Sequence, residues 1–303
     1  MKVYDCFTFY NEFELLELRL KALWDVVDHF VIVEANRKHN GEPKDFNFPK
    51  RAEEFKEFWS KIRYVNADLS NVPFKGVGDW SIEHAQRDAI LNGINDAQAE
   101  DFIFISDADE FPPFDILQLI YTNRVPVFVN HILPPLANGK RLSLMCNSSV
   151  KTTDLLEHCP LTMAQTFHYY YFDYICNGLC ECTIITKRKN LTTPQGLRQF
   201  VKHWPRIAVG HHLSYMGGVD RVINKMKSIV EGNEFVARSG GKVIDRKHVE
   251  ESIAKGTDIY GRKGIPESQF YPYDAKNIRL PHLNEFLRKY PHFLREPEKY
   301  FTN

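Results

Sequence analysis

Neither sign of charge predominates in this 303-residue sequence, because 39 Lys and Arg side chains balance 39 Asp and Glu side chains. A basic excess drives non-specific binding to nucleic acids and anionic membranes, so the balance predicts no nucleic-acid partner. A small anion such as a nucleotide can still be bound, since its site needs only a few well-placed charges. The length fits one large domain or two closely packed ones.

Long apolar runs and cysteines are also scarce. No stretch reaches the roughly 18–20 apolar residues that cross a bilayer, and the N-terminus lacks the apolar core of a secretory signal. We therefore expect no membrane span and a cytoplasmic location. Six cysteines are too few for a disulfide scaffold. Cys176, Cys180 and Cys182 form a CxxxCxC cluster, but the paired CxxC spacing of structural zinc is missing, which favours buried free thiols.

Strand and helix patterns alternate over the first ~130 residues and predict an α/β sheet with helices on its faces. The expected strands are 2–9, 28–35, 61–66 and 101–106, and the expected helices are 16–27, 51–60 and 79–95. From about residue 125 the pattern changes to partly antiparallel strands. These are expected at 125–133, 141–146, 162–175 and 182–187, with helices near 218–232 and 246–255 and a Pro- and Tyr-rich tail.

Three carboxylates, those of Asp107, Asp109 and Glu110, follow the apolar strand at 101–106. Ligands of open α/β sheets gather at the carboxyl ends of strands. Like charges packed this closely are costly unless a cation lies among them. Oxygen ligands at this spacing suit Mg²⁺ or Mn²⁺, which in turn would bind a diphosphate. The alternative is a solvated acidic turn in which Asp109 or Glu110 caps the next helix.

Further motifs occur in a recognisable order. Asn11 and Glu12 follow the first strand, Glu34 ends the second, and the blocks W-x-x-E-x-x-x-R-D (with Arg87), SDADEFP and GHHLSYMGGVDRVINKMKS come later. Helix capping is the alternative for Asn11 and Glu12. The first two features resemble nucleotide-diphospho-sugar transferases of the GT-A fold. Together the blocks, over residues ~4–262, resemble glycosyltransferase family 17.

This resemblance implies a metal-dependent, inverting transfer of a sugar, GlcNAc above all, from a UDP-sugar to a hydroxyl of a glycan acceptor, with Mn²⁺ or Mg²⁺ as the cofactor. It implies an α/β fold of the GT-A type, with a Rossmann-like mixed central sheet flanked by helices. We expect one catalytic domain with a nucleotide-sugar-binding half at 1–124, an acceptor-side half at 125–264 and a wrapping tail at 265–303.

The resemblance also assigns roles to residues of the first half. Asp107 and Asp109 form the D-x-D motif, in which Asp109 contacts the metal and Asp107 contacts the ribose or a metal-bound water. Glu34 would face the uracil, Asn11 would help to hold the nucleoside, and Arg87 would lie near the donor nucleotide or the acidic cluster. A surface ion pair with Glu83, four residues before it, is the alternative for the arginine.

In the second half, His212 corresponds to the family histidine and is expected to be a third metal ligand, since imidazole binds Mn²⁺-type metals. A hydrogen-bonded core histidine is the alternative. Lys225 and Ser228 fit a K-x-x-S pattern in which the lysine would neutralise phosphate charge; a solvated helix face is the alternative.

Inversion requires one general base for the acceptor hydroxyl. Four carboxylates are candidates: Glu234, Glu231, Asp173 and Glu181. We favour Glu234 because it lies in the segment after the Lys225 motif.

Two other functions compete with this hypothesis. A metal-dependent sugar-nucleotidyltransferase or phosphotransferase shares the α/β pattern, but the sequence has neither a Walker motif nor a Gly-rich N-terminal pyrophosphate loop. A catalytically inactive sugar- or nucleotide-binding protein is the second alternative. The intact Asp107, Asp109 and Glu110 count against it.

Overall fold

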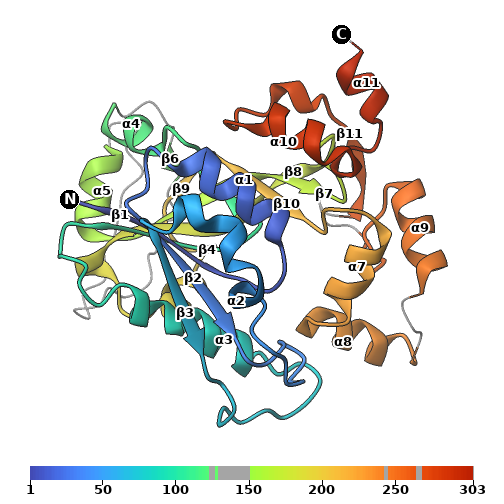
Figure 1. Cartoon of the computed structure of the whole chain (residues 1–303), viewed down its shortest axis with the longest axis horizontal. Coiled ribbons are helices and arrows are strands. Elements are labelled where there is room, and N and C mark those ends of the chain that lie inside the picture. The colour runs from blue at the N-terminus through green and yellow to red at the C-terminus, as the bar shows by residue number, and fades with distance from the viewer. Residues whose placement is uncertain (123–126, 129–150, 242–244, 264–267, 303) are drawn as a thin grey trace.

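The computed structural model describes residues 1–122, 127–128, 151–241, 245–263 and 268–302. It is a mixed α/β fold in which helices flank a curled central sheet (Figure 1). The strands follow one another across the main path of the sheet in the order β3-β2-β1-β4-β8-β7-β10-β5. None of the described helices is both long enough and apolar enough to cross a membrane.

The N-terminal part of the sheet consists of parallel strands, of which β1, β2 and β4 are almost wholly buried and the edge strand β3 is partly exposed. Its strands are β1 (Val3–Thr8), β2 (His29–Ala35), β3 (Ile62–Ala67) and β4 (Phe102–Asp107). Its helical segments are α1 (Phe13–Leu23), α2 (Phe48–Arg51), the 3₁₀ segment Ala52–Phe58, α3 (Ser81–Asp88), the 3₁₀ segment Ala89–Gly93 and α4 (Ile116–Tyr121).

The rest of the sheet is mixed and continues without a break, because β8 pairs antiparallel with β4. β7 and β8 form a hairpin, and β10 runs parallel to β7. The strands are β5 (Glu110–Phe111), β6 (Val127–Phe128), β7 (Leu161–Tyr169), β8 (Tyr174–Lys187), β9 (Arg206–Ile207), β10 (His211–Ser214) and β11 (Phe270–Pro272).

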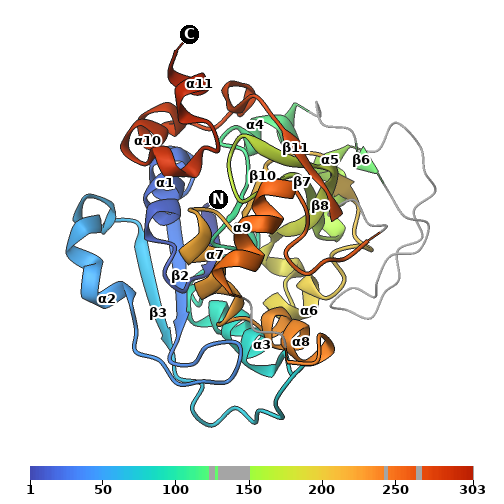
Figure 2. The same cartoon turned by 90° about the vertical axis from the view of Figure 1, so that its right-hand side faces the viewer.

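The later helices form two groups. α7, α8 and α9 gather on one side of the sheet, whereas α10 and α11 lie beside α1 (Figures 1 and 2). The bounds are α5 (Thr152–His158), α6 (Pro194–Arg198), α7 (Val219–Met226), α8 (Val230–Arg238), α9 (Arg246–Lys255), α10 (Leu283–Lys289) and α11 (Pro297–Phe301), with 3₁₀ turns at Arg188–Asn190, Ala275–Asn277 and Pro291–Phe293.

Several expected elements differ from the observed ones. The strand expected at 162–175 ends at Tyr169, and β8 then runs for 14 residues through the separate strand expected at 182–187. The helix expected at 218–232 is two helices, and the one at 51–60 is mostly 3₁₀. A Cβ on Gly232 would lie 1.7 Å from the Met226 carbonyl oxygen, so α8 crosses the end of α7 only because this residue is glycine. The strands expected at 125–133 and 141–146 fall almost entirely outside the described residues, apart from β6.

The C-terminal tail packs on α1 through apolar side chains that include Leu15, Leu18, Leu283 and Phe286. Polar contacts centre on Glu17 of α1, which accepts hydrogen bonds from Lys21, Lys289 and the Tyr290 hydroxyl. Although partial burial raises the pKa of the Glu17 carboxyl, these hydrogen bonds outweigh burial and lower it.

Replacing Glu17 by glutamine is therefore expected to lower the free energy of unfolding at pH 7 by about 1 kcal/mol. A depressed folded-state pKa contributes stability above the unfolded value, and that contribution is lost as the pH falls through the folded-state pKa. Urea unfolding at pH 7 and pH 3.5 should thus show the difference between variant and parent shrinking at the lower pH. Glu285→Gln, at a more exposed partner of Lys21, is the control with a smaller effect. A difference that persists unchanged at pH 3.5 would contradict this account.

Candidate functional site

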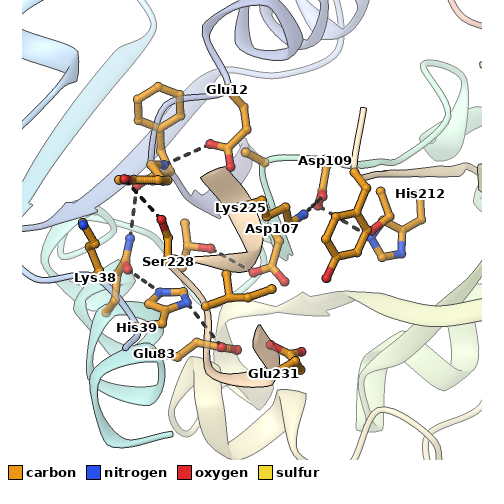
Figure 3. Close-up of a pocket in the computed structure, with 18 of the residues that line it drawn as sticks. Glu12, Lys38, His39, Glu83, Asp107, Asp109, His212, Lys225, Ser228 and Glu231 are labelled. Carbon is orange, nitrogen blue, oxygen red and sulfur yellow. Dashed lines mark hydrogen bonds and ion pairs between the residues drawn. The ribbon is translucent and has the colours of Figure 1, made fainter. Parts of the chain in front are cut away.

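A cavity of about 360 Å³ opens at the carboxyl ends of β1 and β4, a volume typical of small-molecule sites. Both halves of the sheet and the α7–α8 region contribute to it (Figure 3). Its lining residues are Thr8, Phe9, Tyr10, Glu12, Arg37, Lys38, His39, Lys44, Glu83, Gln86, Asp107, Ala108, Asp109, Phe167, Tyr169, Cys180, His212, Ser214, Tyr215, Lys225, Ser228, Ile229, Glu231, Tyr260 and Arg262.

Asp107 ends β4 opposite Thr8 of β1, whose hydroxyl donates a hydrogen bond of 2.9 Å to Asp107 Oδ1. Two guanidinium groups flank the carboxylate, with Arg87 Nη2 at 3.1 Å from Oδ1 and Arg198 Nη2 at 3.3 Å from Oδ2. Burial raises the pKa of Asp107, but the two arginines outweigh it and hold this pKa well below the usual range. The group therefore stays ionised, with Arg87 beside it.

Asp109 brings two predicted residues together at the cavity wall. Lys225 Nζ lies 2.7 Å from Asp109 Oδ2, and His212 Nε2 lies 3.6 Å from Oδ1. Burial raises the pKa of Asp109, but the two neighbours lower it overall. Burial likewise opposes the charge of Lys225, yet Asp109 raises the lysine pKa above its ordinary value. An acidic and two basic side chains from distant parts of the sequence thus form one charged group.

Glu110 points away from the cavity and is not one of its lining residues. Its carboxylate accepts hydrogen bonds from Arg198 Nη1 at 2.9 Å, Thr183 Oγ1 at 3.3 Å and the Asp107 amide at 3.1 Å. Burial raises its pKa. Of the three clustered carboxylates, two are therefore open to a ligand and the third fixes the turn.

Arg19 of α1 binds the turn from Asp107 to Glu110, the acidic turn. It is completely buried and forms a two-bond ion pair with Asp5 of β1, at 2.6 and 2.7 Å. Its Nη1 donates to the main-chain carbonyls of Asp107, Ala108 and Glu110. The guanidinium fork therefore ties the turn that carries both cavity carboxylates to the first strand. Nothing in the helical pattern around Arg19 distinguishes it from a surface arginine.

His212 of β10 stacks on the Phe167 ring, with ring centroids 4.8 Å apart, and its Nδ1 lies 3.2 Å from Cys180 Sγ. Although burial opposes protonation, Cys180 and Asp109 raise the pKa of His212 to about 9. Hydrogen bonding by Cys182 and the nearby imidazole lower the pKa of Cys180. Cys176 and Cys182 are buried, whereas Cys180 is only partly buried and faces the cavity.

Glu34 does not line the cavity, although the family resemblance implied that it faces the uracil. Its side chain has no exposed surface. The carboxylate accepts hydrogen bonds from Lys44 Nζ (2.6 Å), the Asn47 and Phe48 amides (2.6 and 2.9 Å) and the Tyr64 hydroxyl (3.1 Å). The segment after β2 folds back over this acid, so Glu34 holds the start of α2. A contact with a ligand would require that segment to open.

Asn11 also falls outside the lining, whereas its neighbours Tyr10 and Glu12 belong to it. Glu12 Oε2 accepts from the amides of Tyr10 and Asn11 at 3.1 and 3.0 Å. No side chain caps the start of α1. These residues therefore shape the turn after β1, and the side chains that reach the cavity belong to Tyr10 and Glu12.

Among the four candidate bases, only Glu231 lines the cavity. Glu234, which the sequence favoured, lies one helical turn further on and pairs with Arg238. Asp173 binds main-chain amides of the tail, and Glu181 pairs with an arginine. Burial and the neighbouring Glu83 raise the pKa of Glu231, which makes it a stronger proton acceptor when ionised. In Figure 3, Glu231 and Glu83 lie on one side of Asp107, and Asp109, Lys225 and His212 on the other.

Comparison with known proteins adds an independent finding. Residues 1–131 match the model of glycosyltransferase family 17. The β-1,4-mannosyl-glycoprotein 4-β-N-acetylglucosaminyltransferases of Homo sapiens and Rattus norvegicus are each 32% identical over 112 residues, and that of Mus musculus is 31% identical over 112. The alignments cover 35% of this chain and 20–21% of each relative, so the chain spans about a fifth of the length of these relatives.

The matched segment contains β1 to β4 and the turn from Asp107 to Glu110. His212, Lys225 and Glu231 lie beyond it, so their roles remain predictions from the motifs and from the cavity. Over residues 1–131 the chain is similar to glycosyltransferase family 17, as the order of its motifs predicted.

Proposed function

We propose that the chain is a glycosyltransferase of the N-acetylglucosaminyl type, which transfers a sugar from a UDP-sugar to a hydroxyl of a glycan acceptor. One observation carries the proposal: Asp107 and Asp109 line a single cavity at the carboxyl end of β4, inside the segment that matches family 17. The parallel strands β3-β2-β1-β4, of which β1 and β4 end at this cavity, support a GT-A type of fold.

The residues at the cavity fit a divalent cation. Asp107 and Asp109 both line the cavity, and the Asp107 side chain is 34% exposed. Asp107 and Asp109 would hold Mn²⁺ or Mg²⁺. When bound, such an ion compensates the charge that develops on a departing diphosphate.

The other residues lining the cavity include a cationic group and a carboxylate. The cationic side chains of Lys38, Lys225 and Arg262 line it and suit the phosphates of a nucleotide. Glu231 faces the same space and would accept the proton of the acceptor hydroxyl while the sugar–phosphate bond breaks on the opposite side of the anomeric carbon. This arrangement supports inversion in a single displacement.

Product analysis with Mn²⁺ and a panel of nucleotide sugars tests the function. Release of UDP from UDP-GlcNAc, with GlcNAc appearing on an N-glycan acceptor, is the expected result. Pyrophosphate release would indicate nucleotidyl transfer instead. Donor binding without transfer to any acceptor would indicate a protein that only binds nucleotide sugars.

The role of Glu231 is testable against a neighbour on the same helix. Glu231→Gln should lower the transfer rate by about 10²–10⁴-fold and leave the affinity for UDP unchanged, because the amide cannot accept the hydroxyl proton. The Glu234 carboxylate pairs with Arg238 and does not line the cavity, so Glu234→Gln should retain most of the activity. The reverse ranking of the two variants, measured as kcat under saturating donor, would restore Glu234 as the base.

A further inference from the structure

Three strands bring sulfur and nitrogen atoms to one wall of the cavity. Cys180 and Cys182 are two residues apart on β8, so their side chains point to the same face of the sheet. β7 lies between β8 and β10 and pairs Gln165 with Cys180 and Phe167 with His212. The cysteines and the histidine therefore meet across the central strand, although 30 residues separate Cys182 from His212.

The ligand atoms of these three residues are already close. His212 Nδ1 lies 3.2 Å from Cys180 Sγ, and Cys180, Cys182 and His212 each place one ligand atom within 4.8 Å of the others. Zn²⁺ binds thiolate sulfur at about 2.3 Å and imidazole nitrogen at about 2.0–2.1 Å, which puts tetrahedral ligand atoms about 3.5–3.8 Å apart. Small side-chain movements therefore suffice to enclose an ion.

The surroundings match those of a metal-bound imidazole. With His212 Nδ1 directed at the thiols, its other nitrogen faces Asp109 Oδ1 at 3.6 Å, and a carboxylate behind a ligating histidine is the usual way to fix its tautomer. The Cys182 thiol donates a hydrogen bond of 2.9 Å to the side-chain oxygen of the buried Gln165, and this proton would leave when a metal binds the sulfur. Cys180 and His212 line the cavity, so an ion can reach them from solvent.

We propose that Cys180, Cys182 and His212 form a binding site for a thiophilic divalent cation, Zn²⁺ by ligand type. Two sulfurs and one imidazole nitrogen select this class, whereas the carboxylates of Asp107 and Asp109 select Mn²⁺ or Mg²⁺. Three protein ligands leave one coordination position open toward the cavity. The site depends on these three side chains and not on the proposed transferase activity.

Cobalt spectroscopy tests the site directly. The full-length chain, freed of metal with a chelator and kept reduced, is titrated with Co²⁺ under anaerobic conditions. We expect one equivalent to bind with an intense thiolate-to-cobalt charge-transfer band, and one equivalent of Zn²⁺ to abolish that band. Cys180→Ser and Cys182→Ser should each remove most of the band. Each should weaken Zn²⁺ binding by at least about 100-fold. Losing a hydrogen-bonding partner of a ligand already weakens metal binding by up to about 100-fold, and losing the ligand itself should cost at least as much.

Two further variants show whether a neighbouring thiol or carboxylate binds the ion instead. Cys176→Ser removes the third thiol of the cluster, which donates to the Gly178 carbonyl, and should keep both band and affinity. Asp109→Asn should keep the band and bind Zn²⁺ about 10-fold more weakly. Circular dichroism verifies that each variant is folded.

Cobalt binding without the band, or a band that survives both Cys180→Ser and Cys182→Ser, would overturn the proposal. UDP binding in Mn²⁺ is measured in parallel. Its absence would count against the proposed function alone, because the cobalt spectrum needs no nucleotide.

Discussion

Replacing Arg19 by lysine is expected to lower the free energy of unfolding by about 1–3 kcal/mol for each buried acceptor that is left without a donor. The guanidinium donates two hydrogen bonds to Asp5 and also donates to three main-chain carbonyls of the acidic turn. A single ammonium has three donors and no planar fork, so it leaves part of this buried set unpaired. Urea unfolding monitored by circular dichroism measures the difference.

A matched change at the surface controls for the chemistry of the substitution. Arg238, whose side chain is 76% exposed, pairs with Glu234, and Arg238→Lys should change the unfolding free energy by no more than about 0.5 kcal/mol. Equal effects of the two variants would show that Arg19 is not the support that its contacts indicate.

The second large effect is expected at Asp109. Asp109→Asn should abolish Mn²⁺-dependent binding of UDP and reduce transfer by at least about 10³-fold, because charge stabilisation by a metal accounts for several kcal/mol of a barrier. Asparagine keeps the shape of the side chain but removes the charge that attracts both a cation and Lys225. Calorimetric titration with UDP, with and without Mn²⁺, measures the loss.

Asp45→Asn is the control for Asp109, because the Asp45 side chain is 83% exposed and lies outside the cavity. This variant should bind UDP as the parent does. Since Asp109→Asn leaves Lys225 without its partner, thermal unfolding of the variant verifies that the fold survives. Unchanged UDP affinity and metal dependence in a folded Asp109→Asn protein would remove Asp109 from the metal site.

The first half of the fold was predictable because β1, β2 and β4 are buried on both faces. Such strands are mostly apolar runs, and these three lie where those runs occur. The edge strand β3 is only partly buried, but it also lies where a strand was expected. The hairpin of β7 and β8 was hidden by an aromatic run. Tyr170 adopts a positive φ of 71° at the turn, where the sequence offers neither glycine nor proline to mark it. β10, four residues with two histidines, has no strand-like pattern at all.

The acidic turn of the site was predictable because its residues are neighbours in sequence. Arg198, which binds both Asp107 and Glu110, comes from a helix 88 or more residues later, and no local pattern marks it. The choice between Glu231 and Glu234 depends on where α8 begins and how it is oriented. The single continuous helix expected at 218–232 defined neither. Periodicity locates helices and strands, but contacts across the sheet decide which side chains share a cavity.

The contacts of Arg19 also set an order of events during synthesis. Arg19 and Asp5 leave the ribosome about ninety residues before the carbonyls that Arg19 will bind. A nascent chain that ends before β4 therefore contains this charged pair without those carbonyl partners. The acidic turn takes its shape only when β4 docks beside β1. The proposed divalent-cation site should therefore form late in folding, once the N-terminal sheet is assembled.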